Sequence, residues 1–591
     1  MYVKRYVVTR GAKRYAYLRL VESYRDEHGR PRHRIVANLG REDELKASGQ
    51  LEQLAGAFAR LDPPLLGVRR EVGPLLIVPH YLGRLGLREL VDRHLPQRGR
   101  AQLTTGEVVV ALICNRLCAP SPLYDVAGWA SGAALQELSG VPAMLLNDDR
   151  LGRALDAFAP VAEEVRGAAC LAAIERCGVE AARLHLDLTA LRVAGAYERS
   201  ALVGRGWGPD GVARQVRVLE AVTGEGVPLY VRPQPGDASE LACVGAGLER
   251  LAALLPPGLC VCADSVLGNW KTLLAADRAG LRFLCPLRAH TGFARRFLDE
   301  VGHGALRPLR YASRRERRLP PAKRTRHRGT LRAWELTDPQ TGACRRFRVA
   351  YIWSSEEARS VAEGRERALR TAEQALARVQ RGLGGRHYPR RKQVDARVAQ
   401  ILPPVRGLIE VETGTRRGKP TLRFWRNEQA ITGAAAADGV YALATNLAGR
   451  LSAGKLLRLY KEQSVVERRH RDLKGPLRVR PIFLQNDERI HALLSVVGLA
   501  LLVFGLIEAD LRRALGEGEE LRGLLPEGRA ARPTGGNVLA VFQALGLTYT
   551  REGIALDRLT ATQRRILGLL SVAIPWPEQG EVGAPNCGRW S

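Results

Sequence analysis

The sequence is poor in lysine, in methionine and in closely paired cysteines. Its 591 residues include two methionines and only ten lysines against 81 arginines, a skew typical of a GC-rich genome. The ten cysteines form no Cys-x2-Cys pair. The nearest neighbours, Cys114 with Cys118 and Cys260 with Cys262, lack the second pair or the histidines that a zinc site needs. We therefore interpret the cysteines as reduced thiols that serve as small core residues.

Long apolar runs are missing as well. The first ten residues contain no apolar segment of the kind that a signal peptide carries, so we expect none. The longest uncharged apolar run, Leu493 to Ile507, has 15 residues and includes two glycines and a serine. Because a membrane span needs roughly 20 such residues, this run predicts a buried core helix and a cytoplasmic protein.

Acidic residues are scarce relative to basic ones. Against 91 Lys+Arg there are 61 Asp+Glu, which leaves a net charge of +30. Codon bias explains arginine over lysine, but it explains basic over acidic residues much less well. Hydrophobic residues at 46% and charged residues at 26% are ordinary globular values, which excludes wholesale disorder. A soluble chain of this length and charge predicts several domains and a polyanionic partner, with nucleic acid as the default.

The first third of the chain divides into three parts. Residues 1–41 alternate with a period near two and predict a small antiparallel sheet, whose basic face is either a DNA contact or a solvated edge. A short helix over 42–60 and a linker around Pro63 and Pro64 follow. From about 75 to 177 the pattern is helical, with a helix that begins at Thr104 or Thr105 and carries Glu107 in its first turn. DNA-reading helices could lie here, although no clean helix-turn-helix is evident.

The middle of the chain predicts an α/β sheet. Residues 184–193 alternate strictly, and 215–233 predict a hairpin around a Gly-Glu-Gly turn. A helix over 240–255, a buried strand over 259–265, a helix over 270–279 and a strand around Phe283 complete a sheet with helices on its faces.

A basic insertion occupies about 290–430. Residues 314–328 carry eight Lys/Arg against one Glu, and 386–392 are basic again. An exposed helix over 354–380 lies between these runs, and a strand over 439–446 follows the insertion. Charge runs are usually solvated faces, but several of them near Tyr388, Phe424 and Trp425 favour contact with phosphate backbones. The candidate contacts are Arg324, Arg326, Arg390 and Arg391.

Two acidic residues lie where α/β sheets usually carry chemistry. Asp187 sits in mid-strand on the polar face, and Asp264 sits at the end of a buried strand. If the two strands are neighbours, the carboxylates face each other and need a divalent cation to stay ionised. Each aspartate alone could equally be a turn former.

A third acidic residue lies on a predicted helix over 456–477. Tyr460, Glu467 and Lys474 follow at spacings of seven, which places them on one helical stripe. His470 and Arg471 fall on the same side at i+3 and i+4 from the glutamate. A salt-bridged surface helix is the alternative interpretation.

These blocks together resemble a known enzyme family. The strings LHLDLTALRV, CADSVLGN and YKEQSVVERRHRDLKGPLRVRP are similar to the three acidic blocks of DDE transposases from bacterial insertion sequences. The resemblance is to the subgroup with a Tyr-x2-Arg-x3-Glu-x6-Lys signature and a long β-rich insertion before the glutamate. It extends to GEVVVALICNRL, LNDDRLGRALDAF, DGVYALATNL and ERIHALL, and so covers most of the chain. Gln463 stands where the signature has arginine.

The resemblance implies an α/β fold with an RNase H-like catalytic core. Asp187 would lie on its first strand, Asp264 on its fourth and Glu467 on its last long helix, and together they would hold two Mg²⁺, or Mn²⁺ in substitution. Tyr460 and Lys474 would contact phosphates, with Gln463 and Arg471 beside them.

The implied function is transposition. The enzyme would bind terminal inverted repeats of double-stranded DNA, cut them and join them to target DNA, as a homodimer in a synaptic complex associated with the nucleoid. A Mg²⁺-dependent nuclease without transposition and a catalytically inactive DNA-binding relative are the alternatives.

The implied organisation has six parts. They are a small basic β unit with a linker (1–70), a helical, DNA-binding domain (71–180), the first part of the core (181–290), the basic insertion, mixed but β-rich (291–435), the second part of the core (436–510) and a C-terminal helical region (511–591).

Overall fold

The computed structural model describes most of the chain. The described residues are 2–10, 13–25, 31–48, 67–97, 101–195, 197–208, 211–254, 258–313, 315–477, 484, 486–516, 518–550 and 553–579. The chain divides into two compact units. The first contains residues 1–71, 545–559 and 574–591, and the second contains 72–544 and 560–573.

The first unit contains the predicted N-terminal sheet. Strands β1 (Tyr2–Arg10), β2 (Lys13–Arg25) and β3 (Pro31–Arg41) pair in that order, and both pairs are antiparallel. Helix α1 (Glu42–Ala47) follows directly and buries Leu45. The rest of the predicted helix over 42–60 and the linker at Pro63 and Pro64 lie outside the described residues.

The same unit adds strands to the C-terminal region, which was expected to be helical. Strands β17 (Gly546–Thr550) and β18 (Gly553–Leu556) form a hairpin, and β17 also pairs with β4 (Arg69–Glu71). The short Leu-Thr-Tyr-Thr run alternates like a strand, but its partner β4 lies more than 470 residues away in the sequence. Helices α19 (Gly535–Phe542) and α20 (Ala561–Leu569) belong to the second unit.

The second unit begins with the predicted helical region. Helix α5 begins after Thr104, whose side chain accepts a hydrogen bond from the backbone of Glu107 while the glutamate side chain accepts one in return. This capping box satisfies two backbone donors and confirms the predicted start. The helices are α3 (Val78–Leu85), α4 (Leu87–His94), α5 (Thr105–Cys118), α6 (Val126–Gly132), α7 (Leu135–Ser139), α8 (Asp148–Phe158) and α9 (Ala162–Cys177).

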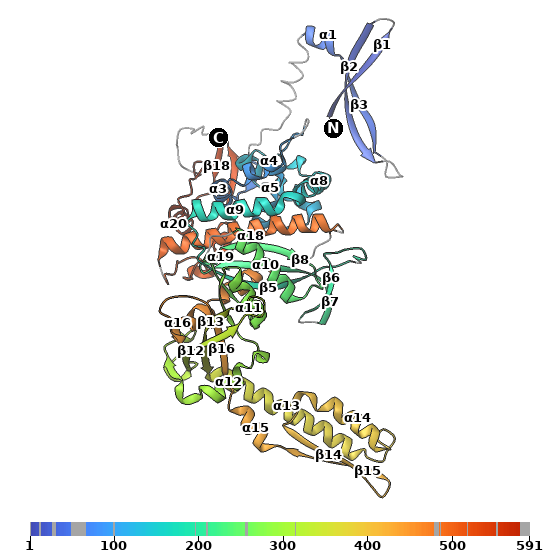
Figure 1. The fold of residues 1–591 in the computed structure, drawn as a ribbon. Coiled ribbons are helices and arrows are strands. Elements are labelled where there is room, and N and C mark those ends of the chain that lie inside the picture. The colour runs from blue at the N-terminus through green and yellow to red at the C-terminus, as the bar shows by residue number, and fades with distance from the viewer. Residues whose placement is uncertain are drawn as a thin grey trace. The chain divides into compact units, whose positions relative to one another are not determined.

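A ten-stranded mixed sheet forms the centre of this unit (Figure 1). Its order is β11-β12-β13-β16-β10-β9-β5-β7-β6, and β8 pairs with β7 beyond the end of β6. Strands β5, β9 and β10 are parallel to one another, whereas β7 is antiparallel to β5 and β16 is antiparallel to β10. The strands are β5 (Arg183–Arg192), β6 (Gly204–Gly208), β7 (Gly211–Thr223), β8 (Pro228–Gln234), β9 (Cys260–Ala263), β10 (Arg282–Pro286), β11 (Arg307–Leu309), β12 (His327–Thr337), β13 (Cys344–Ser354) and β16 (Val440–Thr445).

Helices cover this sheet, as the alternation of predicted strands and helices indicated. Helix α10 (Glu240–Leu254) contacts β5 and β7, and α11 (Trp270–Arg278) contacts β10. The alternating pattern of β5 predicts one polar face, yet His185 on that face is fully buried. The reason is that β5 is a central strand, so that elements packed on the sheet cover both of its faces.

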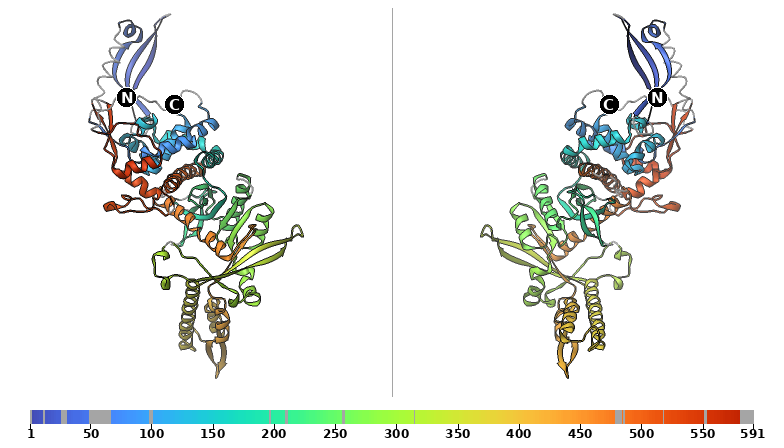
Figure 2. Two further views of the ribbon diagram at one scale, coloured as in Figure 1. Left: turned by 90° about the vertical axis from the view of Figure 1, so that its left-hand side faces the viewer. Right: turned by 90° about the vertical axis from the view of Figure 1, so that its right-hand side faces the viewer.

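The apolar run at Leu493 to Ile507 forms the middle of the longest helix, α18 (Asp487–Leu515). Among the described helices it alone is long and apolar enough to cross a membrane, but 94% of its most apolar window is buried inside the structure. It packs against β8 on one side and against α5, α8 and α9 on the other, so it lies between the helical region and the sheet (Figure 2). The predicted buried core helix is therefore confirmed.

The insertion has two parts. Strands β11, β12 and β13 extend the central sheet, which agrees with the expected β content. Residues 355–435 instead fold around their own hydrophobic core, formed by α13, α14, β14 and β15, and we call this part the lobe. Helix dominates the lobe, so the expectation of a β-rich insertion holds only for the first part. The elements of the lobe are α13 (Ser355–Arg381), α14 (Arg391–Ile401), β14 (Ile409–Arg416), β15 (Lys419–Arg426) and α15 (Glu428–Ala435).

The prediction of a single helix over 456–477 is wrong. Two helices, α16 (Ala453–Lys461) and α17 (Ser464–Lys474), meet at Glu462 and Gln463. At this junction the amides of residues 463, 465 and 466 donate to carbonyls three residues back rather than four. Such a tight turn rotates more per residue than an α-helix does, so Tyr460 and Glu467 do not share one continuous helical stripe.

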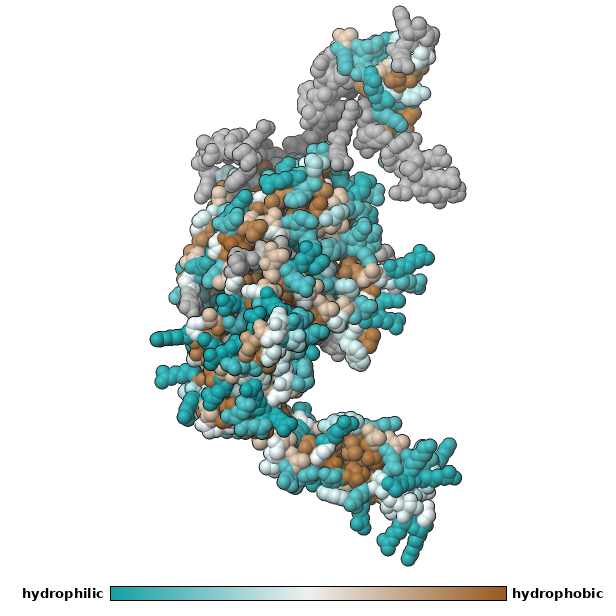
Figure 3. All heavy atoms as spheres, viewed as in Figure 1, coloured by the Kyte–Doolittle hydropathy of each residue, from teal (hydrophilic) through white to brown (hydrophobic). Residues whose placement is uncertain are grey.

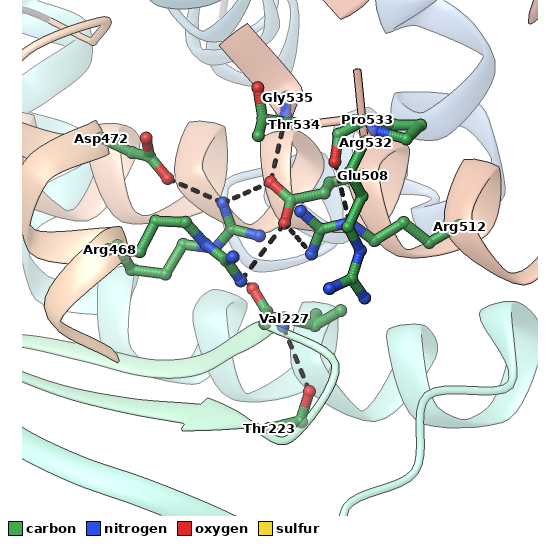
Figure 4. Close-up of polar contacts among 12 residues, drawn as sticks. Thr223, Val227, Arg468, Asp472, Glu508, Arg512, Arg532, Pro533, Thr534 and Gly535 are labelled. Carbon is green, nitrogen blue, oxygen red and sulfur yellow. Dashed lines mark hydrogen bonds and ion pairs between the residues drawn. The ribbon is translucent and has the colours of Figure 1, made fainter. Parts of the chain in front are cut away.

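A buried carboxylate joins α17 to α18 (Figure 4). Glu508 of α18 is fully buried, and it pairs with Arg469 (3.0 Å) and Arg468 (3.4 Å) of α17 and with Arg512 of its own helix. It also accepts a hydrogen bond from the backbone N–H of Gly535 at 3.1 Å. Burial alone would raise the pKa of Glu508, but the three arginines hold it below its ordinary value. The carboxylate therefore stays ionised inside the core.

We predict that Glu508→Ala destabilises the protein by about 3–5 kcal/mol, because it removes the buried counter-charge that Arg468, Arg469 and Arg512 share. Urea unfolding monitored by circular dichroism measures this change. Glu300→Ala is the control, since Glu300 pairs with Arg296 at the surface and its loss should cost less than about 1 kcal/mol. Equal effects of the two substitutions would contradict the prediction.

Candidate active site

Asp187 and Asp264 lie side by side at one edge of the parallel strands. Strands β5 and β9 pair directly, with Leu186 opposite Ala263. Asp187 is the next residue on β5, and Asp264 is the first residue after β9 ends. The condition on which the two-carboxylate prediction rested, that the strands are neighbours, is met.

Both aspartates lie in surroundings that disfavour the charged form of their carboxyl groups. Burial, helped by Asp264 and Glu467, raises the pKa of Asp187 to about 7, although the Leu188 amide donates a hydrogen bond to it at 2.9 Å. Burial also raises the pKa of Asp264, which accepts a hydrogen bond from the Val266 amide at 2.9 Å. Without an added cation, the two groups are therefore not both stably ionised at neutral pH.

The signature residues of α16 and α17 face the same edge. Burial and the carboxylates of Asp264, Glu467 and Asp187 raise the pKa of the Tyr460 hydroxyl to about 12. Glu467 is exposed on the first turn of α17, yet its charge is felt by both Asp187 and Tyr460. The break at Glu462 and Gln463 thus changes the helix geometry. It still leaves Tyr460 within electrostatic reach of Asp187, Asp264 and Glu467.

A buried glutamate and a histidine lie directly behind Asp187. Glu220 on β7 is the cross-strand partner of Asp187 and is fully buried. His470 of α17 lies between them, with Nδ1 3.6 Å from Asp187 Oδ2 and Nε2 3.8 Å from Glu220 Oε2. Burial raises the pKa of Glu220 to about 8 and lowers that of His470 to about 3, so both are neutral at pH 7.

Helical spacing in the sequence predicts that His470 lies beside Glu467, whereas Glu220 was not among the predicted site residues. Glu220 falls in the apolar run VLEAV, and a lone acid inside a strand that reads as buried is the signal that could have found it. Its proximity to Asp187 depends on the register between β5 and β7, which the sequence does not specify.

The donor set of this edge suits a hard divalent cation. Asp187, Asp264 and Glu467 supply only carboxylate oxygens, the ligands that Mg²⁺ and Mn²⁺ prefer. Glu240 of α10 adds further negative charge toward both aspartates. Within the described residues no three His, Cys, Asp or Glu side chains lie close enough together to hold a metal ion as they stand.

The other predicted phosphate contacts fall into three places. Gln463 precedes α17 and Arg471 is exposed on it, while Lys474 ends that helix half-buried. Arg324 donates to the carbonyls of Leu319 and Arg317, so its guanidinium also closes a loop of the insertion. Arg326, beside β12, is exposed.

Arg390 and Arg391 lie in the lobe, at the start of α14. Both are exposed, and Arg391 makes only a 3.5 Å contact with Asp395. The β14–β15 turn, with Arg416, Arg417 and Lys419, is also exposed. It lies near the loop before α14, because a Cβ added at Gly384 would be 3.9 Å from the side chain of Lys419. Hydrophilic side chains gather over this end of the lobe (Figure 3). The structure thus brings the acidic residues together but does not bring all the basic ones to the same place.

We predict that Glu220→Gln stabilises the protein at pH 8 but not at pH 4. The folded-state pKa is about 8, against about 4.5 in the unfolded chain, so the contribution of Glu220 is fully present below pH 4.5 and is lost as the pH rises toward 8. Glutamine mimics the protonated acid and removes this loss, which should be worth more than about 1 kcal/mol at pH 8. Thermal unfolding at the two pH values tests it, with the exposed Glu198→Gln as a control that shows no such difference.

Two family models match the N-terminal part of the chain. Residues 5–63 match the IS1634 family transposase, N-terminal domain, and residues 69–164 match a domain of unknown function, DUF4277. The first match covers the β1–β3 sheet, and the second covers the helices from α3 to the start of α9. A search of curated proteins finds no match. Together with the resemblance of the acidic blocks, the two matches support an insertion-sequence transposase.

Proposed function

We propose that this transposase cuts and joins DNA with a DDE active site formed by Asp187, Asp264 and Glu467. The observation that carries the proposal is the adjacency of the two aspartates at the edge of β5 and β9, with Tyr460 and Glu467 within electrostatic reach. Carboxylates so placed raise one another's pKa, and a divalent cation is the partner that would offset this.

The strand order supports an RNase H-like core. Strands β8, β7 and β5 pair antiparallel, and β9 and β10 continue from β5 in parallel. If β5, β7, β8, β9 and β10 are taken as the five strands of the core, Asp187 lies on the first and Asp264 directly follows the fourth. This is the placement that the resemblance to DDE transposases implies, with β6 as an addition.

In the proposed reaction Asp187, Asp264 and Glu467 would hold two Mg²⁺ ions. Bound there, the two ions would lower the pKa of the attacking water and neutralise charge on the phosphate. A water oxygen bonds to phosphorus while the bond to the 3′-oxygen breaks, which leaves a free 3′-OH. That hydroxyl then attacks a target phosphodiester, so one phosphate ester replaces another. The water and later the attacking 3′-OH each give up a proton to solvent, and each leaving 3′-oxygen takes up a proton from solvent.

The remaining residues of the site position the phosphates. Tyr460 keeps its proton at neutral pH, because its pKa is about 12, and so can donate a hydrogen bond to a phosphate oxygen. Lys474 and Arg471 supply positive charge from α17, in the absence of the signature arginine at Gln463. His470 and Glu220 form an uncharged support behind Asp187.

We predict that Asp187→Ala, Asp264→Ala and Glu467→Ala each lower Mg²⁺-dependent cleavage of a terminal-repeat duplex by at least about a thousandfold, since each removes ligands worth several kcal/mol to the transition state. DNA binding by gel shift should remain largely intact. Glu462→Gln is the matched control, because Glu462 pairs with Arg183 at the opposite end of β5 at 2.6 Å. Cleavage at the wild-type rate by any of the three variants would refute the site.

We predict that the lobe contacts the phosphate backbone through Arg390 and Arg391. Replacing either with alanine should weaken DNA binding at every sequence tested and lower the slope of log K against log salt by about one. Arg370→Ala is the control within the same lobe, because Arg370 already pairs with Glu366 at 2.9 Å. An unchanged salt slope in both variants would exclude the lobe from the DNA interface.

A further inference from the structure

The hairpin formed by β6 and β7 exposes an aromatic side chain. Trp207 is 79% exposed, more than any other described Trp, Tyr or Phe. Val212, 55% exposed, is its direct cross-strand partner, so the two form one apolar spot on one face of the hairpin. An indole left in water is unusual, and it marks a surface that gains from being covered.

The sequence Gly-Arg-Gly-Trp-Gly of β6 fixes which face Trp207 takes. A Cβ at Gly204 would overlap the backbone nitrogen of Asp237, and one at Gly206 would overlap the side chain of Gln215. These glycines therefore face the protein. Because side chains alternate along a strand, Arg205 and Trp207 must point the other way, into solvent.

The strand is held firmly at its start. The carboxylate of Asp487, the first residue of α18, accepts hydrogen bonds from the amides of Ala201 (2.7 Å) and Leu202 (3.1 Å). The Gly236 amide donates to the Leu202 carbonyl at 3.0 Å. Trp207 is thus presented from an anchored element of the core.

Two arginines lie directly opposite each other beside the indole. Arg205 pairs with Arg214 across the two strands, on the face that carries Trp207 and Val212. Like charges in this arrangement are unfavourable unless an anion lies between them. The guanidinium of Arg214 also donates to the Gly195 carbonyl at 2.6 Å, which fixes its position.

The hairpin projects from the edge that carries the acidic residues. Strand β9 ends beside Leu186, whereas β5 and β7 continue as a pair to Arg192 and Gln215, and β6 extends the pairing to Gly211. Val212 lies eight residues along β7 from Glu220, the partner of Asp187. At about 3.4 Å per residue this is about 27 Å, the length of about eight base pairs of DNA.

We propose that this face of the hairpin, with Trp207, Val212, Arg205 and Arg214, binds duplex DNA about eight base pairs from the phosphate that is cut. The two arginines hold the backbone, and the indole inserts at a base step, as apolar wedges flanked by arginines do. The inference rests on the proposed function for the position of the cut. A second copy of the chain is the less favourable occupant, since it would bring the same positive charge to the surface.

The test uses the full-length protein without divalent metal and a duplex that spans the border of the element, with 2-aminopurine at successive positions. Wild-type protein should change the fluorescence at a position about eight base pairs from the cut. Trp207→Ala should lose this signal and bind about tenfold more weakly with an unchanged salt slope, and Trp207→Phe should restore most of both. Arg205→Ala should lower the salt slope by about one.

Leu298→Ala, which removes an apolar side chain 42% exposed on helix α12 (Phe293–Glu300), is the control and should bind as wild type. If Trp207→Ala keeps the signal and the affinity, the inference is wrong. It is also wrong if the substitution changes only the molecular mass measured by light scattering, because the surface then binds a second copy. Mg²⁺-dependent cleavage by the wild type is scored separately, so failure of the active site and failure of this surface give different results.

Discussion

The pairing of Glu508 with three arginines is the interaction on which the rest of the second unit depends. It ties α17, which carries Glu467, to the long buried helix α18, and Arg469 continues the link by donating to the Gly226 carbonyl in the β7–β8 turn at 2.6 Å. A buried charge with a partner removed is far more costly than a pair replaced as a whole. Helix α17, which carries Glu467, is therefore held in place by residues outside the candidate site.

Helix α18 contacts several parts of the second unit. Arg84 pairs with Asp510 at 2.6 Å and Arg489 pairs with Asp156 at 2.7 Å, which attaches the helical region to one side of α18, while β8 packs on another. The same helix supplies Asp487, which anchors the start of β6. The helix thus links the region that matches the domain of unknown function, the sheet edge with the aspartates and the hairpin with Trp207.

The candidate site is acidic although the protein as a whole is basic. Net charge is strongly positive, yet Asp187, Asp264, Glu467 and Glu240 concentrate negative charge at one edge of the sheet, and Glu220 behind them is kept neutral by burial. Basic side chains lie in several separate places, on α17, beside β12, at the end of the lobe and on the β6–β7 hairpin. Such a distribution attracts a polyanion while it leaves the edge itself for cations.

Several elements of this protein could be predicted from local sequence pattern. The strands around Asp187 and Asp264, the capped start of α5, the exposed helix α13 and the buried run in α18 all follow from periodicity, capping and apolar length, which are properties of neighbouring residues. The folded structure was needed to establish the break at Gln463, the pairing of β17 with β4, the helical lobe, and the positions of Glu220 and Trp207. The physical reason is that strand register and buried ion pairs join residues far apart in the chain, and their energies depend on burial that no local pattern contains.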